Sequence, residues 1–252
     1  MSKKSFHVWG LHSVKALLTF NPHLALNVWL KEPPRSEAQD EIFALAQTAG
    51  VSIEIVAAKA LDKLSEGANH QGVVANRRSP AITNLKSFLT ETLAKEAAPI
   101  FLALDQIQDP QNLGTCLRLA DTAGVAGVVI TEAGQAPISG TAAKIASGAM
   151  DSVPIVQIAN LGNGLRALAK SGVWIIGTDD SATDIYSNTD MRGPICLVMG
   201  SEGEGLRHRT RELCDFLVSI PVEGYVGSLN VANAAAVCLF EARRQRQVAV
   251  PE

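Results

Sequence analysis

The sequence predicts an α/β protein with a mainly parallel sheet in its C-terminal part and a smaller α/β unit before it. Short apolar strands alternate with amphipathic helices along most of the 252 residues. Such alternation is typical of parallel sheets that helices cover on both faces. Turn residues such as Asp109 and Pro110 separate consecutive segments. A content of 47% hydrophobic residues against 19% charged residues is enough for a complete core.

The N-terminal part is expected to fold as a small α/β domain over residues 1–76. Apolar spacing predicts helices over 12–20 and 36–50 and strands over 26–30, 51–57 and 71–77. Ser36 followed by Gln39 resembles a capping box, and Gly50 is a helix stop signal. Residues 77–97, bounded by prolines and amphipathic in the middle, suit a linker that carries a helix.

The C-terminal part, residues 98–252, alternates between strands and helices in the same way. The expected strands cover 100–105, 127–131, 153–158, 173–178, 195–199 and 216–220. The expected helices cover 112–124, 139–148, 161–171, 206–214 and 228–246. We therefore expect one further domain here.

Composition and charge narrow the class of protein. The first ten residues lack the apolar stretch of a signal peptide, and Leu229 to Phe240 is too short and too rich in Asn to span a bilayer. We expect a cytoplasmic protein with no membrane partner. The four cysteines are widely spaced without a C-x-x-C pattern, which disfavours a metal site or a redox pair and favours reduced core thiols.

A formal net charge of −3 argues against general affinity for nucleic acid. Any contact with RNA must then come from local basic clusters. The sequence contains four candidates, at Lys3-Lys4, Arg77-Arg78, 207–211 and 243–246. Taken singly, each cluster is more typical of a solvated face than of a binding patch.

The first unusual loop is DPQNLGTCLRLADTAGV, which follows the apolar run IFLALDQI. Helical spacing from Asn112 onward makes Asn112 a plausible N-cap. Arg118 lies away from the apolar face, and its guanidinium is expected to reach back over Gly114. A permanent cation over a bare glycine suggests a docking site, although an ordinary helix with a solvated arginine fits these residues as well.

The second loop is ICLVMGSEGEGLR, in which a strand runs into Gly200, Gly203 and Gly205. The spacing is neither the dinucleotide fingerprint nor a P-loop, but it allows close approach of the backbone to a ligand. Glu202 is a carboxylate near a helix N-terminus, where it has either a chemical role or a capping role.

The third loop is IPVEGYVGSLNVANAAAVCLFEARRQ. Ser228 is a good N-cap for the helix that follows. That helix is apolar or small on nearly all sides, which suggests a subunit interface. Asn230 and Asn233 would share one helix face as buried amides, either in a ligand site or in a network that only determines packing.

Together the three loops resemble, in order and spacing, the three motifs of the SpoU-type branch of the SPOUT methyltransferases. These enzymes move a methyl group from S-adenosylmethionine to a ribose 2'-hydroxyl in RNA. The segments WGLHSVKALL, GANHQGVVA and KIASGAMDSVPI extend the likeness over the whole chain, toward the bacterial members that methylate a guanosine in 23S rRNA. One departure lies after Ser-Leu-Asn, where VANAAAV replaces the usual hydroxyl residue and valine.

The resemblance implies a ribosomal-protein-like RNA-binding domain at 1–76 and a trefoil-knotted α/β domain at 98–252 that works as a homodimer. It implies S-adenosylmethionine as cofactor, held by backbone around Gly200, Ile220 and Leu229. It also implies 23S rRNA as partner, without metal or membrane. The implied catalytic residues are Arg118, Asn112, Glu202, Ser228 and Asn230.

Arg118 is a poor general base because a guanidinium is not deprotonated in proteins. We expect it to grip an RNA phosphate and orient the 2'-hydroxyl, while the proton leaves through phosphate or water. Three other functions stay open at this point: the same chemistry on tRNA, a non-catalytic rRNA-binding assembly factor, and a nicotinamide oxidoreductase. The last lacks the dinucleotide fingerprint.

Overall fold

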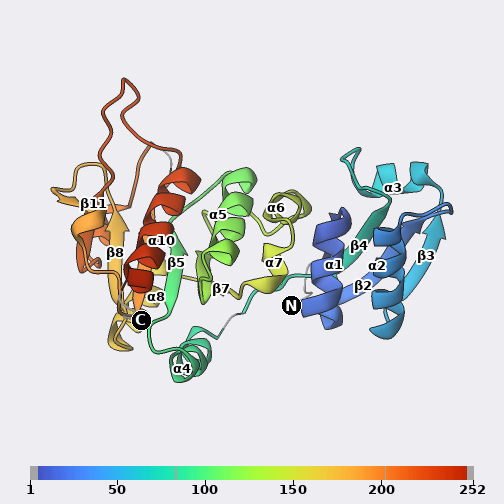
Figure 1. Ribbon diagram of the computed structural model, residues 1–252, viewed down its shortest axis with the longest axis horizontal. Coiled ribbons are helices and arrows are strands. Elements are labelled where there is room, and N and C mark those ends of the chain that lie inside the picture. Colours follow the sequence, from blue (N-terminus) through green and yellow to red (C-terminus); the bar gives the residue numbers. More distant parts are fainter. Residues whose placement is uncertain (1–4, 83, 202, 249–252) are drawn as a thin grey trace. The chain divides into compact units, whose positions relative to one another are not determined.

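The structure is a computed structural model that describes residues 5–82, 84–201 and 203–248. Contacts divide the chain into two compact units. Unit 1 consists of Met1–Pro80 and Pro137–Ser152, and unit 2 consists of Ala81–Ala136 and Val153–Glu252. Each unit has its own sheet, shown in Figure 1.

Unit 1 contains a four-stranded sheet in the order β1-β4-β2-β3. The strands are β1 (Ser5–Trp9), β2 (Ala25–Lys31), β3 (Ser52–Val56) and β4 (Val73–Arg78). The helices are α1 (Leu11–Phe20), α2 (Glu37–Thr48), α3 (Ala58–Leu64) and the 3-10 turn η1 (Pro22–Leu24). The capping box is confirmed, since the Ser36 side chain and Gln39 bond each other's backbone amides. Strand β1 and helix α3 were not expected from the sequence.

Two short helices from the middle of the chain also pack in unit 1. They are α6 (Gly140–Ala146) and α7 (Ala149–Ser152). The Ser13 hydroxyl donates to the Ala143 carbonyl at 3.1 Å, and a Cβ at Gly140 would lie 2.3 Å from the His7 carbonyl oxygen. The sequence pattern places this segment in the domain over 98–252, whereas these contacts are with N-terminal residues.

A buried ion pair joins β4 to α7 within unit 1. The Arg77 guanidinium contacts Asp151, and both side chains are almost fully buried. Asn21 donates to the same Asp151 carboxylate at 3.0 Å. The Arg77 cation is therefore compensated inside the protein, so Arg77 is not part of an exposed RNA-binding patch.

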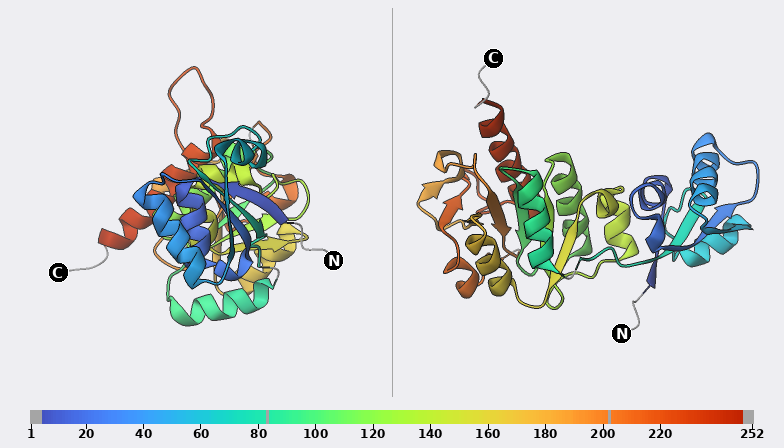
Figure 2. Two further views of the ribbon diagram at one scale, coloured as in Figure 1. Left: turned by 90° about the vertical axis from the view of Figure 1, so that its right-hand side faces the viewer. Right: turned by 90° about the horizontal axis from the view of Figure 1, so that it is seen from below.

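Unit 2 contains a seven-stranded sheet in the order β7-β6-β5-β10-β8-β11-β9, and every pairing in it is parallel. The strands are β5 (Ile100–Leu104), β6 (Gly127–Thr131), β7 (Ile155–Ile158), β8 (Trp174–Thr178), β9 (Asp184–Ile185), β10 (Ile195–Met199) and β11 (Phe216–Ser219). The α/β fold class with a mainly parallel sheet is confirmed. The right-hand view of Figure 2 shows strands of this sheet from a second direction.

Helices cover both faces of the sheet in unit 2. They are α4 (Leu85–Lys95), α5 (Pro110–Thr122), α8 (Leu161–Lys170), α9 (His208–Arg211), α10 (Val231–Val248) and the 3-10 turn η2 (Tyr186–Asn188). Leu161, Leu165 and Leu168 of α8 pack on one sheet face. Helices α5 and α10 pack together on the other (Figure 1).

The cysteines are free thiols, as expected. Burial raises the pKa of Cys116 and of Cys238 to about 12, because the thiolate form would lose its hydration. Among the residues that the structure describes, no helix combines the length and apolar character needed to cross a bilayer.

Candidate cofactor cavity and active site

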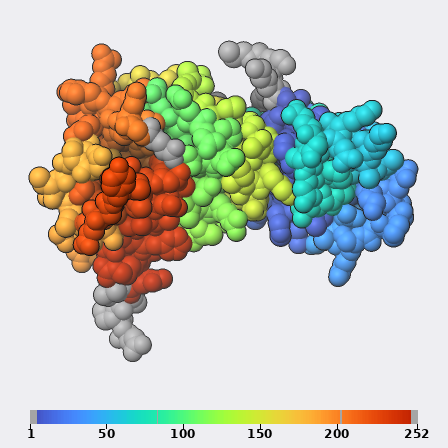
Figure 3. Space-filling model, turned by 90° about the horizontal axis from the view of Figure 1, so that it is seen from above, coloured from blue at the N-terminus to red at the C-terminus, as the bar shows by residue number. Residues whose placement is uncertain are grey.

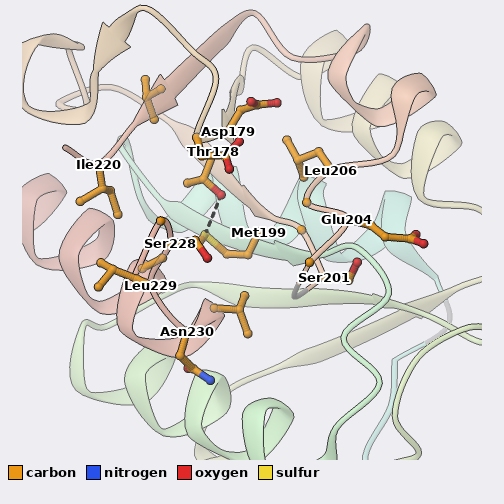
Figure 4. A pocket seen from close by; sticks show the side chains of 18 of the residues that line it. Thr178, Asp179, Met199, Ser201, Glu204, Leu206, Ile220, Ser228, Leu229 and Asn230 are labelled. Carbon is orange, nitrogen blue, oxygen red and sulfur yellow. Dashed lines mark hydrogen bonds between the residues drawn. The ribbon is translucent and has the colours of Figure 1, made fainter. Parts of the chain in front are cut away.

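A cavity of about 420 Å³ lies at the carboxyl ends of β8, β10 and β11. Three chain segments form most of its wall: residues 178–180, residues 199–201 with 203–206, and the stretch from Val218 to Ala234. Arg211 completes it. The carboxyl ends of parallel strands are the usual ligand-binding edge of an open α/β sheet. Figure 4 shows side chains from all three segments around this cavity.

The glycine loop after β10 folds back on itself beside the cavity. Ser201 and Gly205 exchange two backbone hydrogen bonds, at 3.0 and 3.1 Å. A Cβ at Gly200 would lie 2.2 Å from the Gly205 carbonyl carbon, and Gly203 and Gly205 have positive φ angles of 85° and 65°. The tight loop therefore requires glycine at these positions. Glu202 lies outside the residues that the structure describes.

The chain between β11 and α10 forms the opposite part of the wall. Ile220, Ser228, Leu229 and Asn230 all line the cavity, together with Gly200 from the glycine loop. The structure thus brings together the three residues that we assigned to cofactor binding and two that we assigned to catalysis. Residues 221–230 are exposed in this chain, and the loop projects from unit 2 in Figures 1 and 2.

The helix caps differ from our expectation. Helix α5 is capped by Asp109, whose carboxylate accepts from the Gln111 amide at 2.9 Å. Helix α10 begins after Asn230, whose side-chain oxygen accepts from the Ala232 amide at 2.9 Å. The prediction that Asn112 and Ser228 are the N-caps is therefore wrong. In both cases another side chain lies closer to the start of the helix.

Asn112 instead pairs with Asn230. The Asn230 amide donates to Asn112 Oδ1 at 3.0 Å, although the two residues are 118 positions apart in the sequence. Asn112 is buried in the first turn of α5. This hydrogen bond ties the start of α10, and with it one wall of the cavity, to α5. Asn233, expected as a buried partner on the same face, is exposed.

Arg118 does not line the cavity of its own chain. Its side chain lies on the exposed face of α5, as expected from the helical spacing. The guanidinium makes no hydrogen bond or ion pair with any residue in 5–82, 84–201 or 203–248. The expected bare surface at Gly114 is wrong, because Gly114 is buried within α5.

Sequence reasoning missed the part of the site that follows β8. Thr178, Asp179 and Asp180 line the cavity, and Figure 4 shows Thr178 and Asp179 beside Met199. The Asp179 carboxylate pairs with Arg211 at 2.7 Å. The polar run Thr-Asp-Asp directly after a buried strand was the available signal, since strand carboxyl ends bind ligands.

The cavity is chemically suited to S-adenosylmethionine. Its wall combines the carboxylates of Asp180 and Glu204 and the Asp179–Arg211 ion pair with the apolar side chains of Leu206, Ile220 and Leu229. Such a mixture fits a ligand with cationic groups, sugar hydroxyls and an aromatic base. The volume lies within the range of small-molecule sites, roughly 300–1,000 Å³. The described ranges contain no group of three or more His, Cys, Asp or Glu residues able to hold a metal.

Comparison with known proteins shows to which class of enzyme this protein belongs. The model of the SpoU rRNA Methylase family matches residues 99–240, which is more than half of the chain. A second family model, described as RNA 2'-O ribose methyltransferase substrate binding, matches residues 7–81. The protein is therefore an RNA methyltransferase. It belongs to the SpoU rRNA methylase family.

Curated relatives match over nearly the full length. The chain is 41% identical over 245 residues to the 23S rRNA (guanosine-2'-O-)-methyltransferase RlmB of Shewanella oneidensis, covering 97% of this chain and 99% of that protein. It is 43% identical over 240 residues to RlmB of Vibrio vulnificus, covering 95% and 96%.

Solved structures support the cofactor. An AdoMet-bound rRNA methyltransferase from Sinorhizobium meliloti superposes with a TM-score of 0.80 at 27% identity, over 95% of this chain and 87% of that one. The SpoU methyltransferase AviRb from Streptomyces viridochromogenes, in complex with AdoMet, gives 0.83 at 25% identity, over 98% and 92%. S-adenosylmethionine, also called AdoMet, is the cofactor of the family.

Proposed function

We propose that this protein methylates the ribose 2'-hydroxyl of a guanosine in 23S rRNA. The observation that carries the proposal is the cavity formed jointly by the glycine loop and the Ser228–Asn230 turn. The full-length likeness to RlmB supports the choice of substrate. A 23S rRNA substrate implies activity in the bacterial cytoplasm.

The backbone around Gly200, Ile220 and Leu229 holds the cofactor in this proposal. When bound, S-adenosylmethionine supplies a methyl group activated by its sulfonium charge. Ser228 and Asn230 position the reacting groups from the cavity wall, and Asn112 supports Asn230 through their hydrogen bond. We assign Glu202 to holding the glycine loop.

Arg118 orients the RNA in this proposal. Its guanidinium is exposed and unpaired among the described residues, so it is available to a phosphate. A planar fork that binds phosphate through two N–H groups can aim the adjacent ribose hydroxyl at the methyl group. The proton of the hydroxyl then leaves to phosphate or water.

We further propose that the protein works as a homodimer. Leu229, Tyr225, Val226 and Phe240 are exposed apolar residues, and Tyr225 is fully exposed. Helix α10, red in Figure 3, lies at the surface of unit 2. Covering these side chains with a second copy would remove apolar area from water. A second copy could also supply the Arg118 that the cavity lacks within one chain.

Methylation assays test the proposed activity. Purified protein with methyl-labelled S-adenosylmethionine should label one guanosine of unmodified 23S rRNA. Mapping of 2'-O-methyl sites in a deletion strain should show loss of that methyl group alone. Labelling of tRNA instead would support the alternative substrate. Cofactor and RNA binding without transfer would indicate an assembly factor.

A further inference from the structure

In two of the four basic clusters, arginines bind other parts of the same chain, and the Lys3-Lys4 cluster lies outside the residues that the structure describes. Arg243 donates to the Ala123 and Gly124 carbonyls, which end α5. Arg246 donates to the backbone of Ala98 and Gly193, and Arg244 pairs with Glu241. The 243–246 cluster, like Arg77, therefore has a structural role.

The cluster at 207–211 is different. Arg207 pairs with the buried Asp105 at 2.6 Å, and Arg211 pairs with Asp179. Arg209, between them, makes no hydrogen bond or ion pair with a residue that the structure describes, and it is exposed. Its charge is therefore available to a ligand.

Arg209 lines a second cavity of about 340 Å³, between α9 and the first turns of α8. The lining residues are Asn160, Gly162, Asn163, Arg166, Arg207, His208, Arg209, Thr210 and Leu213. None of them is acidic, and Leu213 is the only large apolar side chain in this set. Arg207 is already paired with Asp105, which leaves the guanidinium groups of Arg166 and Arg209 in a concave wall whose described lining residues include no carboxylate, and such a surface favours anions.

The first turns of α8 complete this surface. Arg166 is exposed and donates to Asn163 Oδ1 at 3.3 Å, which leaves its other N–H groups available. A Cβ at Gly162 would lie 3.2 Å from Leu213 Cδ1 and 3.6 Å from Arg166 Nη1. The positive end of the α8 dipole adds to the attraction for an anion.

The second cavity lies close to the cofactor cavity. Helix α9 separates them: Arg211 lines the cofactor cavity, whereas His208, Arg209 and Thr210 line the second. The backbone of α9 rises only about 6 Å over its four residues, so neighbouring residues of one short helix line both cavities. With the cofactor in the first cavity, an RNA whose ribose lies at the mouth of that cavity can place a neighbouring phosphate in the second.

We propose that this second cavity binds a backbone phosphate of the substrate RNA next to the methylated nucleotide, gripped by Arg166 and Arg209. The proposal rests on an RNA substrate, as proposed above. Two guanidinium forks and an almost wholly polar wall suit phosphate rather than an acidic protein surface, whose interface core would be more apolar. Arg166 and Arg209 are thus RNA-positioning residues and do not act on the methyl group.

The test compares Arg166→Ala, Arg209→Ala, the double variant and Arg209→Lys with wild type. All are exposed positions, so folding should be retained, which melting curves check. Each alanine change should weaken binding of the rRNA fragment about tenfold and lower the salt dependence of binding by about one phosphate contact. Arg209→Lys should recover most of the charge effect. Turnover at saturating RNA and affinity for S-adenosylmethionine should not change.

Lys170→Ala is the matched control, since Lys170 is an exposed cation at the other end of α8. It should leave RNA affinity unchanged. An RNA affinity and a salt dependence equal to those of wild type in the double variant would overturn the phosphate site. If the double variant binds RNA normally but no longer binds an acidic protein, the cavity is a protein-binding site instead. If wild type itself does not methylate rRNA, the proposed function fails instead, which is a separate result.

Discussion

The hydrogen bond between Asn112 and Asn230 links two of the three motif loops at the level of single side chains. Asn230 has two tasks, since it caps α10 and donates to the buried Asn112. Loss of a cap costs about 1 kcal/mol, and loss of a partner for a buried amide costs about 1–3 kcal/mol. The residue therefore serves both stability and the shape of the cavity.

We expect Asn230→Ala to lower the free energy of unfolding by about 2 kcal/mol and to weaken cofactor binding. Asn230→Ser keeps a capping oxygen but cannot reach Asn112, so it should recover about 1 kcal/mol of stability without recovering cofactor affinity. Denaturant unfolding and calorimetry measure the two effects. If both variants bind the cofactor as tightly as wild type, the hydrogen bond between Asn112 and Asn230 does not contribute to cofactor binding.

A second prediction at the residue scale concerns the role of Arg118. If its planar fork grips phosphate and aims the ribose, Arg118→Lys and Arg118→Ala should be similarly damaging to methyl transfer, because lysine lacks the bidentate geometry. Cofactor binding and stability should change little, within about 0.5 kcal/mol for an exposed position. Single-turnover methylation of an rRNA fragment measures the rates. A lysine variant with most of the wild-type rate would indicate a purely electrostatic role.

At the scale of elements, the glycine loop is a closed turn whose first residue lies against its last. The sequence suggested that Gly200 makes room for a ligand. In the structure, the backbone of Gly205 and Leu206 occupies the space that a side chain at position 200 would fill. A larger residue would first displace the loop itself.

We therefore expect Gly200→Val to abolish binding of S-adenosylmethionine while the sheet stays folded. Gly193→Ala is the matched control, because a Cβ there meets nothing within 4 Å. Calorimetry should show normal affinity in the control and none in the valine variant, and circular dichroism should show two folded proteins. Near-normal affinity in Gly200→Val would remove the loop from the cofactor site.

At the scale of the whole molecule, mixing experiments test whether one active site uses two chains. The Gly200→Val chain keeps Arg118 but is expected to have no working cofactor cavity. The Arg118→Ala chain keeps the cavity but lacks Arg118. If Arg118 serves the cavity of the other copy, equal mixing should restore about a quarter of the wild-type activity, since half of the dimers are mixed and each has one complete site. No restoration in dimers shown to have exchanged subunits would place Arg118 and the cavity in the same chain.

A fragment that begins at Ala98 tests the division of labour between the units. It contains every residue that lines the cofactor cavity, so it should bind S-adenosylmethionine and dimerise but methylate rRNA poorly. It also retains α6 and α7 without the N-terminal residues that bury them, such as those around Arg77. We expect a lower melting temperature than for the full chain. Full activity on rRNA fragments would contradict the assignment of RNA binding to residues 1–76.

Local pattern was enough to predict most of the elements and the motif loops. Except for β9 and η2, which were not predicted, the strands and helices in unit 2 fall within a few residues of the predicted ranges, because buried faces impose a period on the sequence. Strand β1 was missed although Ser5 to Val8 alternate between polar and apolar residues, because this run is short and a helix signal follows it directly. The caps of α5 and α10 were misplaced, because several residues with suitable side chains stand near each start and only backbone geometry selects one.

Contacts between residues far apart in the chain could be learned only from the tertiary structure. The sequence by itself determined the α/β class, the three loops and the exposed position of Arg118, all of which follow from composition and period along one segment. It could not determine that Asn230 bonds Asn112, that Arg77 is neutralised by Asp151, or that α6 and α7 belong to unit 1. Each of these depends on which surfaces meet after folding. The free energy of such a contact comes from desolvation and geometry across the fold, which no local pattern records.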